Sequence, residues 1–496
     1  MTISTAVDVS QVGRALGIST TYRGLPAGNI RMLPQQIAVI GQGTTAKSGY
    51  VHTGVRVYNA TEAGDLYGYG SPIHLAVRQL FPDNGDGVGS IPVTCYGLDD
   101  DVAGTAALGS IIPVGATQGT DYTYTIKVNN IACTVALVAA DTPTTAVAKM
   151  KAAINAVANM PVIATNVVVT TLALAAKWKG KTGEDLYVEV IGTVYSLTFG
   201  VTQPVTGGTS PVVTAALTAI GTRWETMVIS CLESSDTVSM AAFSAWGEGR
   251  WGALIRKPAV VFYGDYQVTV AGAITVPNAR TTDRTNCQLV EPGGNDLPCV
   301  VAARQVARIA KQANNNPPVD YGSLSCEGLT PGADGDQWDN AMKDAAVKGG
   351  SSTVDKLDGV VKISDVVTFY HPAGDPLPAY RYVVDIIKLQ NILYNLDLIF
   401  SAPEWAGAPL VPDDQPTKNP AAKKPKMARA AICSMIDALA DEAILSNPKA
   451  AKAATECEIS STNPKRLDCR VPVQLSGNTN IRSIDLLFGF YFGGSV

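Results

Sequence analysis

Residues 227–232, MVISCL, and 259–264, AVVFYG, are two short apolar runs, and residues 297–312, LPCVVAARQVARIAKQ, place apolar residues at helical spacing. Short runs rich in β-branched and aromatic residues predict buried strands, whereas the third segment is long enough for a helix. Strands that alternate with helices are typical of an α/β domain. We therefore expect such a domain in this part of the chain.

The same kind of pattern occurs before residue 104. Ser71 followed by Pro72 is a typical helix start, because Ser caps free N–H groups and Pro fits the first helical position. Apolar runs that predict strands are found at 35–40 (QQIAVI), 54–58 (GVRVY) and 91–96. We expect one discontinuous central α/β domain formed by residues 21–104 and 208–358.

Between these two pieces the pattern changes. Residues 120–138 alternate polar and apolar side chains around Asn129-Asn130, which predicts a β-hairpin. A helix near 144–158 and strand-like runs near 162–174 and 186–199 follow. Because turn-rich segments flank this unit, we expect residues 105–207 to form an inserted, β-rich peripheral domain.

The chain after residue 358 carries both kinds of element. The pattern predicts strands at 359–370 and 470–475 and helices at about 379–400 and 425–445. We expect a mixed α/β carboxy-terminal domain over 359–480. The fold class predicted for the whole chain is multi-domain α+β.

The last sixteen residues, IRSIDLLFGFYFGGSV (481–496), have an apolar side chain at every second position and predict a β-strand. The alternating residues are Ile484, Leu486, Phe488, Phe490 and Phe492. An apolar strand at a chain end must pair with an edge. That edge belongs either to the core of the same subunit or to another chain.

Composition excludes several classes of protein. The chain is 46% hydrophobic and 16% charged with a formal net charge of −5, so bulk electrostatics do not favour nucleic acid. Nine scattered cysteines and three histidines favour a reducing compartment over a disulfide framework or a zinc site. We expect no metal site. We also expect no secretory signal and no membrane-spanning segment, because no basic-then-apolar leader or long apolar run is present.

One segment approaches a catalytic motif. Residues 41–48, GQGTTAKS, resemble a phosphate-binding P-loop, but Ala46 replaces the glycine before Lys47, and no helix is predicted to follow. No GxSxG nucleophile motif is present, and the aspartate-rich turns lack calcium-loop spacing. The residues therefore indicate no enzyme.

A run of basic residues precedes the predicted helix at 425–445. The segment TKNPAAKKPKMAR (417–429) contains no acidic residue. It forms either a solvated face or a patch that docks on an acidic partner. The basic residues nearest the helix are Lys423, Lys424, Lys426 and Arg429.

Taken in order, these segments resemble the contractile tail sheath proteins of bacteriophages, most closely the Mu-like group. The stretch 55–98 shares their order of strand, Glu-Ala pair, glycine-flanked aromatic, helix and strand. Further similar segments are GTDYTYTIKVNN (119–130), DTPTTAVAKMKAAINA (141–156), KWKGKTGEDLYVEV (177–190), PKMARAAICSMIDAL (425–439), NPKRLDCRVPVQL (463–475) and the terminal strand. The stretch 414–426 departs from the family, being rich in Ala and Lys.

The resemblance implies a structural subunit. Sheath subunits stack as six-fold rings around an inner tail tube, and their carboxy-terminal domain is completed by the amino-terminal arm. Terminal arms, here 1–20 and 481–496, would add strands to neighbouring subunits. The resemblance thus implies subunit-linking roles for Ile3, Val7, Val9 and the alternating terminal residues. It also makes Lys423, Lys424, Lys426 and Arg429 candidates for the face toward the tube.

The resemblance further implies contraction that drives the tube through the host envelope without a cofactor. Expected partners are further copies of the chain, the tail tube protein and the baseplate and tail terminator proteins. The expected location is the virion, after assembly in the host cytoplasm. Two alternatives stay open: an enzyme that binds a nucleoside triphosphate at 41–48, and another self-assembling surface or capsid-type protein.

Overall fold

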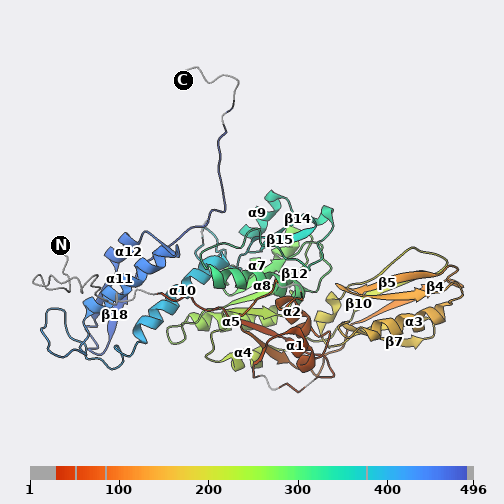
Figure 1. Ribbon diagram of the computed structural model, residues 1–496, viewed down its shortest axis with the longest axis horizontal. Coiled ribbons are helices and arrows are strands. Elements are labelled where there is room, and N and C mark those ends of the chain that lie inside the picture. The colour runs from red at the N-terminus through yellow and green to blue at the C-terminus, as the bar shows by residue number, and fades with distance from the viewer. Residues whose placement is uncertain are drawn as a thin grey trace, which may run out of the picture. The chain divides into compact units, whose positions relative to one another are not determined.

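The structure is a computed structural model of the 496-residue chain, and it describes residues 30–47, 49–50, 53–83, 86–375, 378–486 and 488. Contacts divide the chain into two compact units. We call the described residues of 32–393 and those from 478 onward the α/β unit, and residues 394–477 with residues 30 and 31 the small unit. Each is described by itself (Figure 1).

A six-stranded sheet forms the centre of the α/β unit. All neighbouring strands are parallel except the last pair, which is antiparallel. The spatial order is β13 (Asn286–Val290), β12 (Val260–Asp265), β11 (Met227–Ser230), β1 (Ile37–Gln42), β3 (Val93–Leu98) and β2 (Val55–Val57). Every residue of the five parallel strands is buried, which explains why their sequences are continuous apolar runs.

Helices cover both faces of this sheet. On one face Ile37, Val39 and Phe262 pack with residues of α2 (Pro72–Leu80) and α8 (Pro298–Asn315). On the other face Ile40 and Tyr263 pack with residues of α4 (Thr214–Ile220) and α5 (Thr237–Trp251). The sequence therefore predicted five of the six strands and the helix α8, whereas β13, α4 and α5 were not predicted. This part of the fold is mixed α/β.

Helix α2 begins as its sequence predicts. The Ser71 side chain accepts a hydrogen bond from the His74 N–H at 3.3 Å, and Pro72 occupies the first turn. A second helix, α1 (Ala60–Tyr67), precedes it and was not predicted. Its N-cap is Asn59, whose side chain accepts from the Glu62 N–H at 2.8 Å. The Asn-x-x-Glu spacing was therefore a readable helix start.

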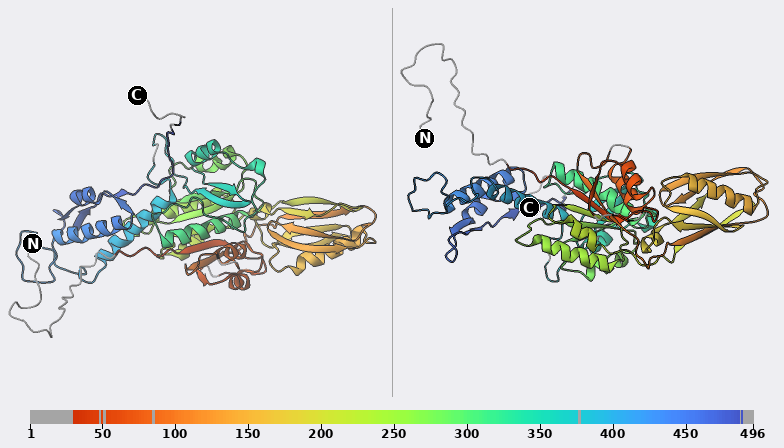
Figure 2. Two further views of the ribbon diagram at one scale, coloured as in Figure 1. Left: turned by 45° about the horizontal axis from the view of Figure 1, so that its top comes forward. Right: turned by 90° about the horizontal axis from the view of Figure 1, so that it is seen from below.

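The stretch from 108 to 205 forms two sheets and one helix (Figures 1 and 2). The predicted hairpin is confirmed: β5 (Tyr122–Val128) and β6 (Ile131–Leu137) pair in full register around Asn129 and Asn130. Strand β9 (Val188–Ile191) completes this sheet. The second sheet has the order β10 (Thr198–Val205), β4 (Leu108–Val114), β8 (Thr171–Ala176) and β7 (Val162–Val168). Helix α3 (Pro143–Ala156) packs against strands of both sheets.

Two strand predictions in this stretch were too coarse. The run 162–174 is a tight hairpin of β7 and β8, and the run 186–199 holds β9 and the start of β10. The apolar pattern continues through both turns, so that hydropathy alone does not mark where the chain reverses.

The α/β unit continues beyond α8 with shorter elements. These are the 3-10 turn η3 (Asp334–Asp336), α9 (Asn340–Lys348) and the hairpin of β14 (Thr353–Leu357) and β15 (Val360–Asp365). The short helices α6 (Val270–Ala273) and α7 (Thr275–Asn278) come earlier, between β12 and β13. Another 3-10 turn, η2 (Lys181–Asp185), lies between β8 and β9. Helix α10 (Val383–Phe400) begins in the α/β unit.

The small unit is built around α11 (Pro425–Asp441). Its buried face includes Ala428, Ile432, Met435 and Leu439, which recur at helical spacing. The helix ends four residues before the predicted end, because Ala443 adopts a left-handed conformation (φ 56°) and Ile444 N–H bonds back to Leu439 O at 2.9 Å.

Small elements complete this unit. They are α12 (Pro448–Ala454), the pair β16 (Leu445–Ser446) and β19 (Gln474–Leu475), and the hairpin β17 (Glu456–Ile459) and β18 (Leu467–Arg470). No helix of the described residues is long and apolar enough to cross a membrane. The predicted division into terminal arms, central, inserted and carboxy-terminal domains stays a prediction.

Candidate functional site

The last described residues leave the α/β unit at a polar anchor. Asn478 Nδ2 donates to the Pro318 carbonyl oxygen at 2.8 Å, and Asn478 Oδ1 accepts from Lys388 Nζ at 2.7 Å. Lys388 is completely buried on α10 and also pairs with Asp385 Oδ1 at 3.0 Å. A buried ammonium group must find such partners, so this bond fixes the position from which the chain departs.

Beyond this anchor, the terminal segment (481–488) exposes its apolar side chains. The exposed fractions are 82% for Ile484, 76% for Leu486 and 90% for Phe488. None of its described residues belongs to a strand, although a strand was predicted, because no strand edge of the described chain pairs with them. These residues are therefore absent from the core of their own chain.

The sequence also predicted linking roles for five other residues. Phe490 and Phe492 at one end, and Ile3, Val7 and Val9 at the other, lie outside the described residues. Their roles stay a prediction.

The basic residues before α11 do not form a free patch. Lys423 Nζ lies 3.3 Å from Glu404 Oε2 and 5.1 Å from the centre of the Trp405 ring, and its side chain is only 14% exposed. Both contacts satisfy the ammonium group within the small unit.

Two of the other three cations are also bonded locally. Lys424 Nζ donates to the Gln415 carbonyl oxygen at 2.6 Å, and Arg429 Nε donates to the Thr455 carbonyl oxygen at 2.8 Å. The Lys426 side chain is exposed. The long segment before α11 is thus held against the helix start by its own lysines, a role that its charge pattern did not predict. The role of these residues toward a tube stays a prediction.

The P-loop-like segment is not arranged for a phosphate. The Thr44 and Thr45 N–H groups donate to carbonyl oxygens of the chain at 2.8 and 2.9 Å. Asp100 accepts from Thr45 Oγ1 at 2.6 Å, and Asp99 accepts from the Gly49 N–H at 2.7 Å. Phosphate loops need free N–H donors, and the Thr44 and Thr45 N–H groups are already bonded within the chain, so this geometry disfavours a nucleotide site.

Buried carboxyl groups lie near the carboxyl ends of the parallel strands, where α/β folds commonly place ligand sites. Asp265, the last residue of β12, accepts from Gln288 Nε2 at 2.5 Å, and desolvation raises its pKa to about 6. Asp185 accepts from the Tyr266 hydroxyl at 2.8 Å, and burial, with the charges of Glu233 and Asp265, raises its pKa to about 7.

Two further acids follow β13. Desolvation and the neighbouring Asp296 charge raise the pKa of Glu291 to about 9, and desolvation raises that of Asp296 to about 6. Asp296 Oδ2 accepts from the Thr330 N–H at 2.6 Å. Among the described residues, no cluster of three or more His, Cys, Asp or Glu side chains has the geometry to hold a metal ion.

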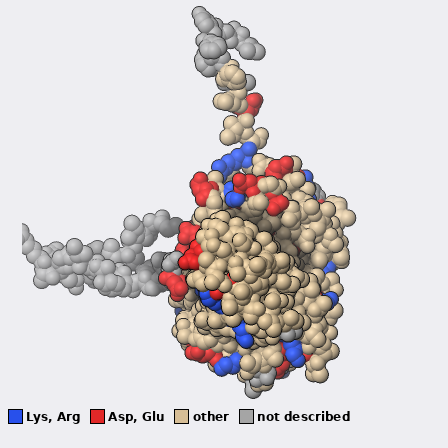
Figure 3. Space-filling view, turned by 90° about the vertical axis from the view of Figure 1, so that its right-hand side faces the viewer, with Lys and Arg blue, Asp and Glu red and all other residues tan. Residues whose placement is uncertain are grey.

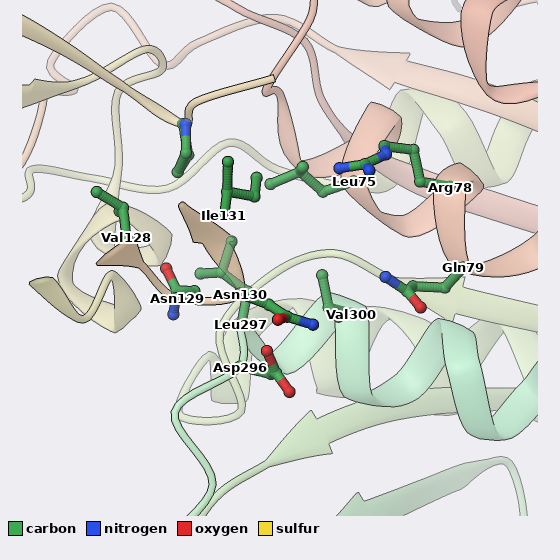
Figure 4. Close-up of a pocket in the computed structure, with 11 residues that line it drawn as sticks. Leu75, Arg78, Gln79, Val128, Asn129, Asn130, Ile131, Asp296, Leu297 and Val300 are labelled. Carbon is green, nitrogen blue, oxygen red and sulfur yellow. The ribbon is translucent and has the colours of Figure 1, made fainter. Parts of the chain in front are cut away.

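The cavity beside these acids is small. It lies between the tip of the β5–β6 hairpin, with Asn129 and Asn130, and the helices α2 and α8 (Figure 4). Its volume is about 80 Å³, well below the size typical of small-molecule pockets. Asn129 Nδ2 donates to the Asn295 carbonyl oxygen at 2.7 Å, so the hairpin tip is packed against the loop before α8.

The face shown in Figure 3 is largely uncharged around its centre. Large apolar side chains are exposed on strands and connecting segments between 108 and 205, among them Leu108, Val114, Val138, Val194 and Val205. Single exposed apolar residues are normal on protein surfaces, so they assign no partner by themselves.

Comparisons with known proteins give structural neighbours only. No protein-family model matches the chain, and no curated protein sequence matches it. Among solved structures, a sheath tail protein from Listeria innocua is similar with a TM-score of 0.49 and 12% identity over 91% of this chain and 94% of that one. A sheath tail protein from Desulfitobacterium hafniense has a TM-score of 0.45 and 13% identity over 89% and 93%.

A third neighbour is the sheath complex of an extracellular contractile injection system in its contracted state. Its TM-score is 0.49 and its identity 10%, over 98% of this chain and 99% of that one.

Proposed function

We propose that this chain is the structural subunit of a contractile phage tail sheath. It polymerises as stacked hexameric rings around the inner tail tube and contracts to drive the tube through the host envelope. The observation that carries the proposal is the terminal segment: three alternating apolar side chains, each at least three-quarters exposed, extend from a buried anchor. The order of sequence segments from 55 to 496 supports the same function.

Exposed alternating apolar residues suit strand addition. The backbone of such a segment pairs with the sheet edge of a neighbour, while every second side chain enters the neighbour's core. A segment that leaves one copy and enters the next makes a heterologous contact, which generates rings or open helices. Polymerisation therefore needs no second protein and no cofactor.

Contraction would repack the surfaces of the folded units while the strand links persist. Main-chain hydrogen bonds tolerate rotation of the domains on either side of them, because the linking segment itself stays extended. The extended sheath would then be a trapped state and the contracted sheath the one of lower free energy. On this proposal Lys426, exposed at the start of α11, is the foremost candidate of the four basic residues for the face toward the tube protein.

The test compares four forms of the full-length chain by sedimentation and negative-stain microscopy. Wild type should form rings or tubes, and a chain lacking 481–496 should stay folded by circular dichroism but monomeric. Leu486→Asp should weaken assembly at least tenfold, since burial of a leucine side chain contributes about 1.5–3 kcal/mol. Asp485→Asn, a change at the adjacent exposed position, is the matched control and should assemble.

Two results would contradict the proposal. Wild-type protein that stays monomeric at high concentration would exclude self-assembly by this chain. A truncated chain that unfolds would show instead that the terminal segment belongs to the core of its own subunit.

A further inference from the structure

The hairpin β17–β18 of the small unit carries two cysteines on neighbouring strands. Six of the nine cysteines are buried, whereas Cys457 and Cys433 are partly exposed and Cys469 is exposed. Cys457 lies on β17 and Cys469 on β18, and the register places them directly opposite each other. Cys433 lies on α11 instead.

The backbone hydrogen bonds of the hairpin show whether Cys457 and Cys469 are a hydrogen-bonded or a non-hydrogen-bonded pair of the ladder. Ser460 N–H donates to Arg466 O at 2.9 Å, so these two residues form a hydrogen-bonded pair. Hydrogen-bonded and non-hydrogen-bonded pairs alternate along an antiparallel ladder. Counting back three positions along the register, Cys457 and Cys469 form a non-hydrogen-bonded pair.

Non-hydrogen-bonded pairs bring side chains closest together. Their Cα atoms lie about 4.5 Å apart, which falls within the span of about 4.4–6.8 Å that disulfides bridge. In agreement, the two thiol groups are close enough for each to shift the pKa of the other. The backbone would need little movement to accommodate a covalent bond between the two sulfur atoms.

We propose that Cys457 and Cys469 are a site of reversible oxidation that closes a cross-strand disulfide in the small unit. The oxidant is a low-molecular-weight disulfide such as oxidised glutathione. A thiolate attacks the oxidant, releases one reduced thiol and forms a mixed disulfide. The second cysteine then attacks its partner's sulfur, releases the other reduced thiol and completes the Cys457–Cys469 bond. Two protons leave, and the two electrons reduce the oxidant.

Oxidation would lock the hairpin as a covalent ring. The bond joins the two strands on one side of the 460–466 loop and fixes their register, while α11, which packs on β17, stays in place. The proposal does not depend on the sheath function, because it rests on the register of a single hairpin.

Electrostatics set the rate of this reaction. Desolvation raises the pKa of Cys457, and desolvation together with the neighbouring Cys457 thiol raises that of Cys469 to about 12. Few thiolates are then present at neutral pH, so oxidation should be slow at pH 7 and faster at pH 8.5.

The test uses the folded full-length chain, oxidised glutathione at pH 8.5, alkylation of free thiols and tryptic mass spectrometry without reductant. Trypsin places the two cysteines in separate peptides, 453–465 and 467–470. We expect these peptides to be joined, with the loss of two hydrogen atoms, and to separate on reduction. The Cys433→Ser variant removes the remaining partly exposed thiol and should give the same linked pair.

Three outcomes bear on the proposal. Linked peptides in the folded wild type and in Cys433→Ser, replaced by scattered pairings when the chain is oxidised in urea, would support it. Stable mixed disulfides of glutathione on Cys469 without linkage would overturn it. So would a preferred linkage of either residue to Cys433.

Discussion

Glu291 provides a quantitative test of the buried charges of the α/β unit. Its side chain is 1% exposed, and neither carboxyl oxygen has a hydrogen-bond partner among the described residues. Desolvation, with the charge of Asp296, raises its pKa from 4.5 to about 9. The folded protein therefore keeps this carboxyl protonated at neutral pH, whereas the unfolded chain ionises it.

Proton linkage gives the direction in which the free energy of unfolding changes with pH. Below pH 4.5 both states hold the proton, and the group has no effect on stability. Between pH 4.5 and 9 the unfolded state gains from ionisation, so the free energy of unfolding falls by about 1.4 kcal/mol per pH unit. At pH 7 this group lowers the free energy of unfolding by about 3 kcal/mol relative to its value below pH 4.5. Glu291→Gln removes this ionisation, and the variant should be more stable than wild type by a similar amount.

Urea unfolding at several values between pH 5 and 8.5 measures the effect. The difference in unfolding free energy between Glu291→Gln and wild type should grow with pH, from about 0.8 kcal/mol at pH 5. Glu327→Gln, which changes an exposed carboxylate, is the matched control and should follow wild type. A difference that is constant with pH, or a variant less stable than wild type at pH 8, would refute the reasoning.

Three further changes test other parts of the structure. Gly264→Ala should destabilise the α/β unit by several kcal/mol or prevent folding, seen as a lower thermal midpoint, because the new Cβ would lie 1.7 Å from the Pro298 carbonyl oxygen. Lys388→Met removes the buried ammonium group at the anchor and should increase deuterium uptake in the carboxy-terminal peptide while the rest of the chain exchanges as before. His74 accepts from the Gly70 N–H at 3.0 Å, and burial lowers its pKa to about 4. Wild type should therefore lose about 1.4 kcal/mol per unit as pH falls from 6.5 toward 4, and urea titrations of His74→Asn should show a smaller loss.

Local signals predicted the elements that depend on few residues. Ser71 and Pro72 specify the start of α2 through one hydrogen bond and one fixed backbone angle, and Asn129-Asn130 permits the tight turn of the hairpin. Both are readable because neighbours in the sequence supply the whole interaction. The start of α5 was equally local, at the Asp236 cap, but its weakly amphipathic sequence concealed it.

The candidate site depends on contacts that the sequence does not encode locally. A core strand and an exposed segment would both show the alternation of Ile484, Leu486 and Phe488. The two are distinguished only by the structure, in which no sheet edge of the described chain pairs with these residues. In the same way Lys423 appeared as one of several free cations. Its pairing with Glu404 depends on how the loop between them folds back.

The anchor at Asn478 has a mechanical consequence. If a neighbouring copy holds the terminal segment, tension along the chain reaches the folded protein first at the Asn478 amide, which is bonded to Pro318 on one side and Lys388 on the other. Because Lys388 is buried within a long helix, the pull is passed to a rigid element instead of unravelling the chain residue by residue. The segment would then behave as a tether of fixed length, and sliding of one subunit past another would be limited by the reach of the residues beyond that amide.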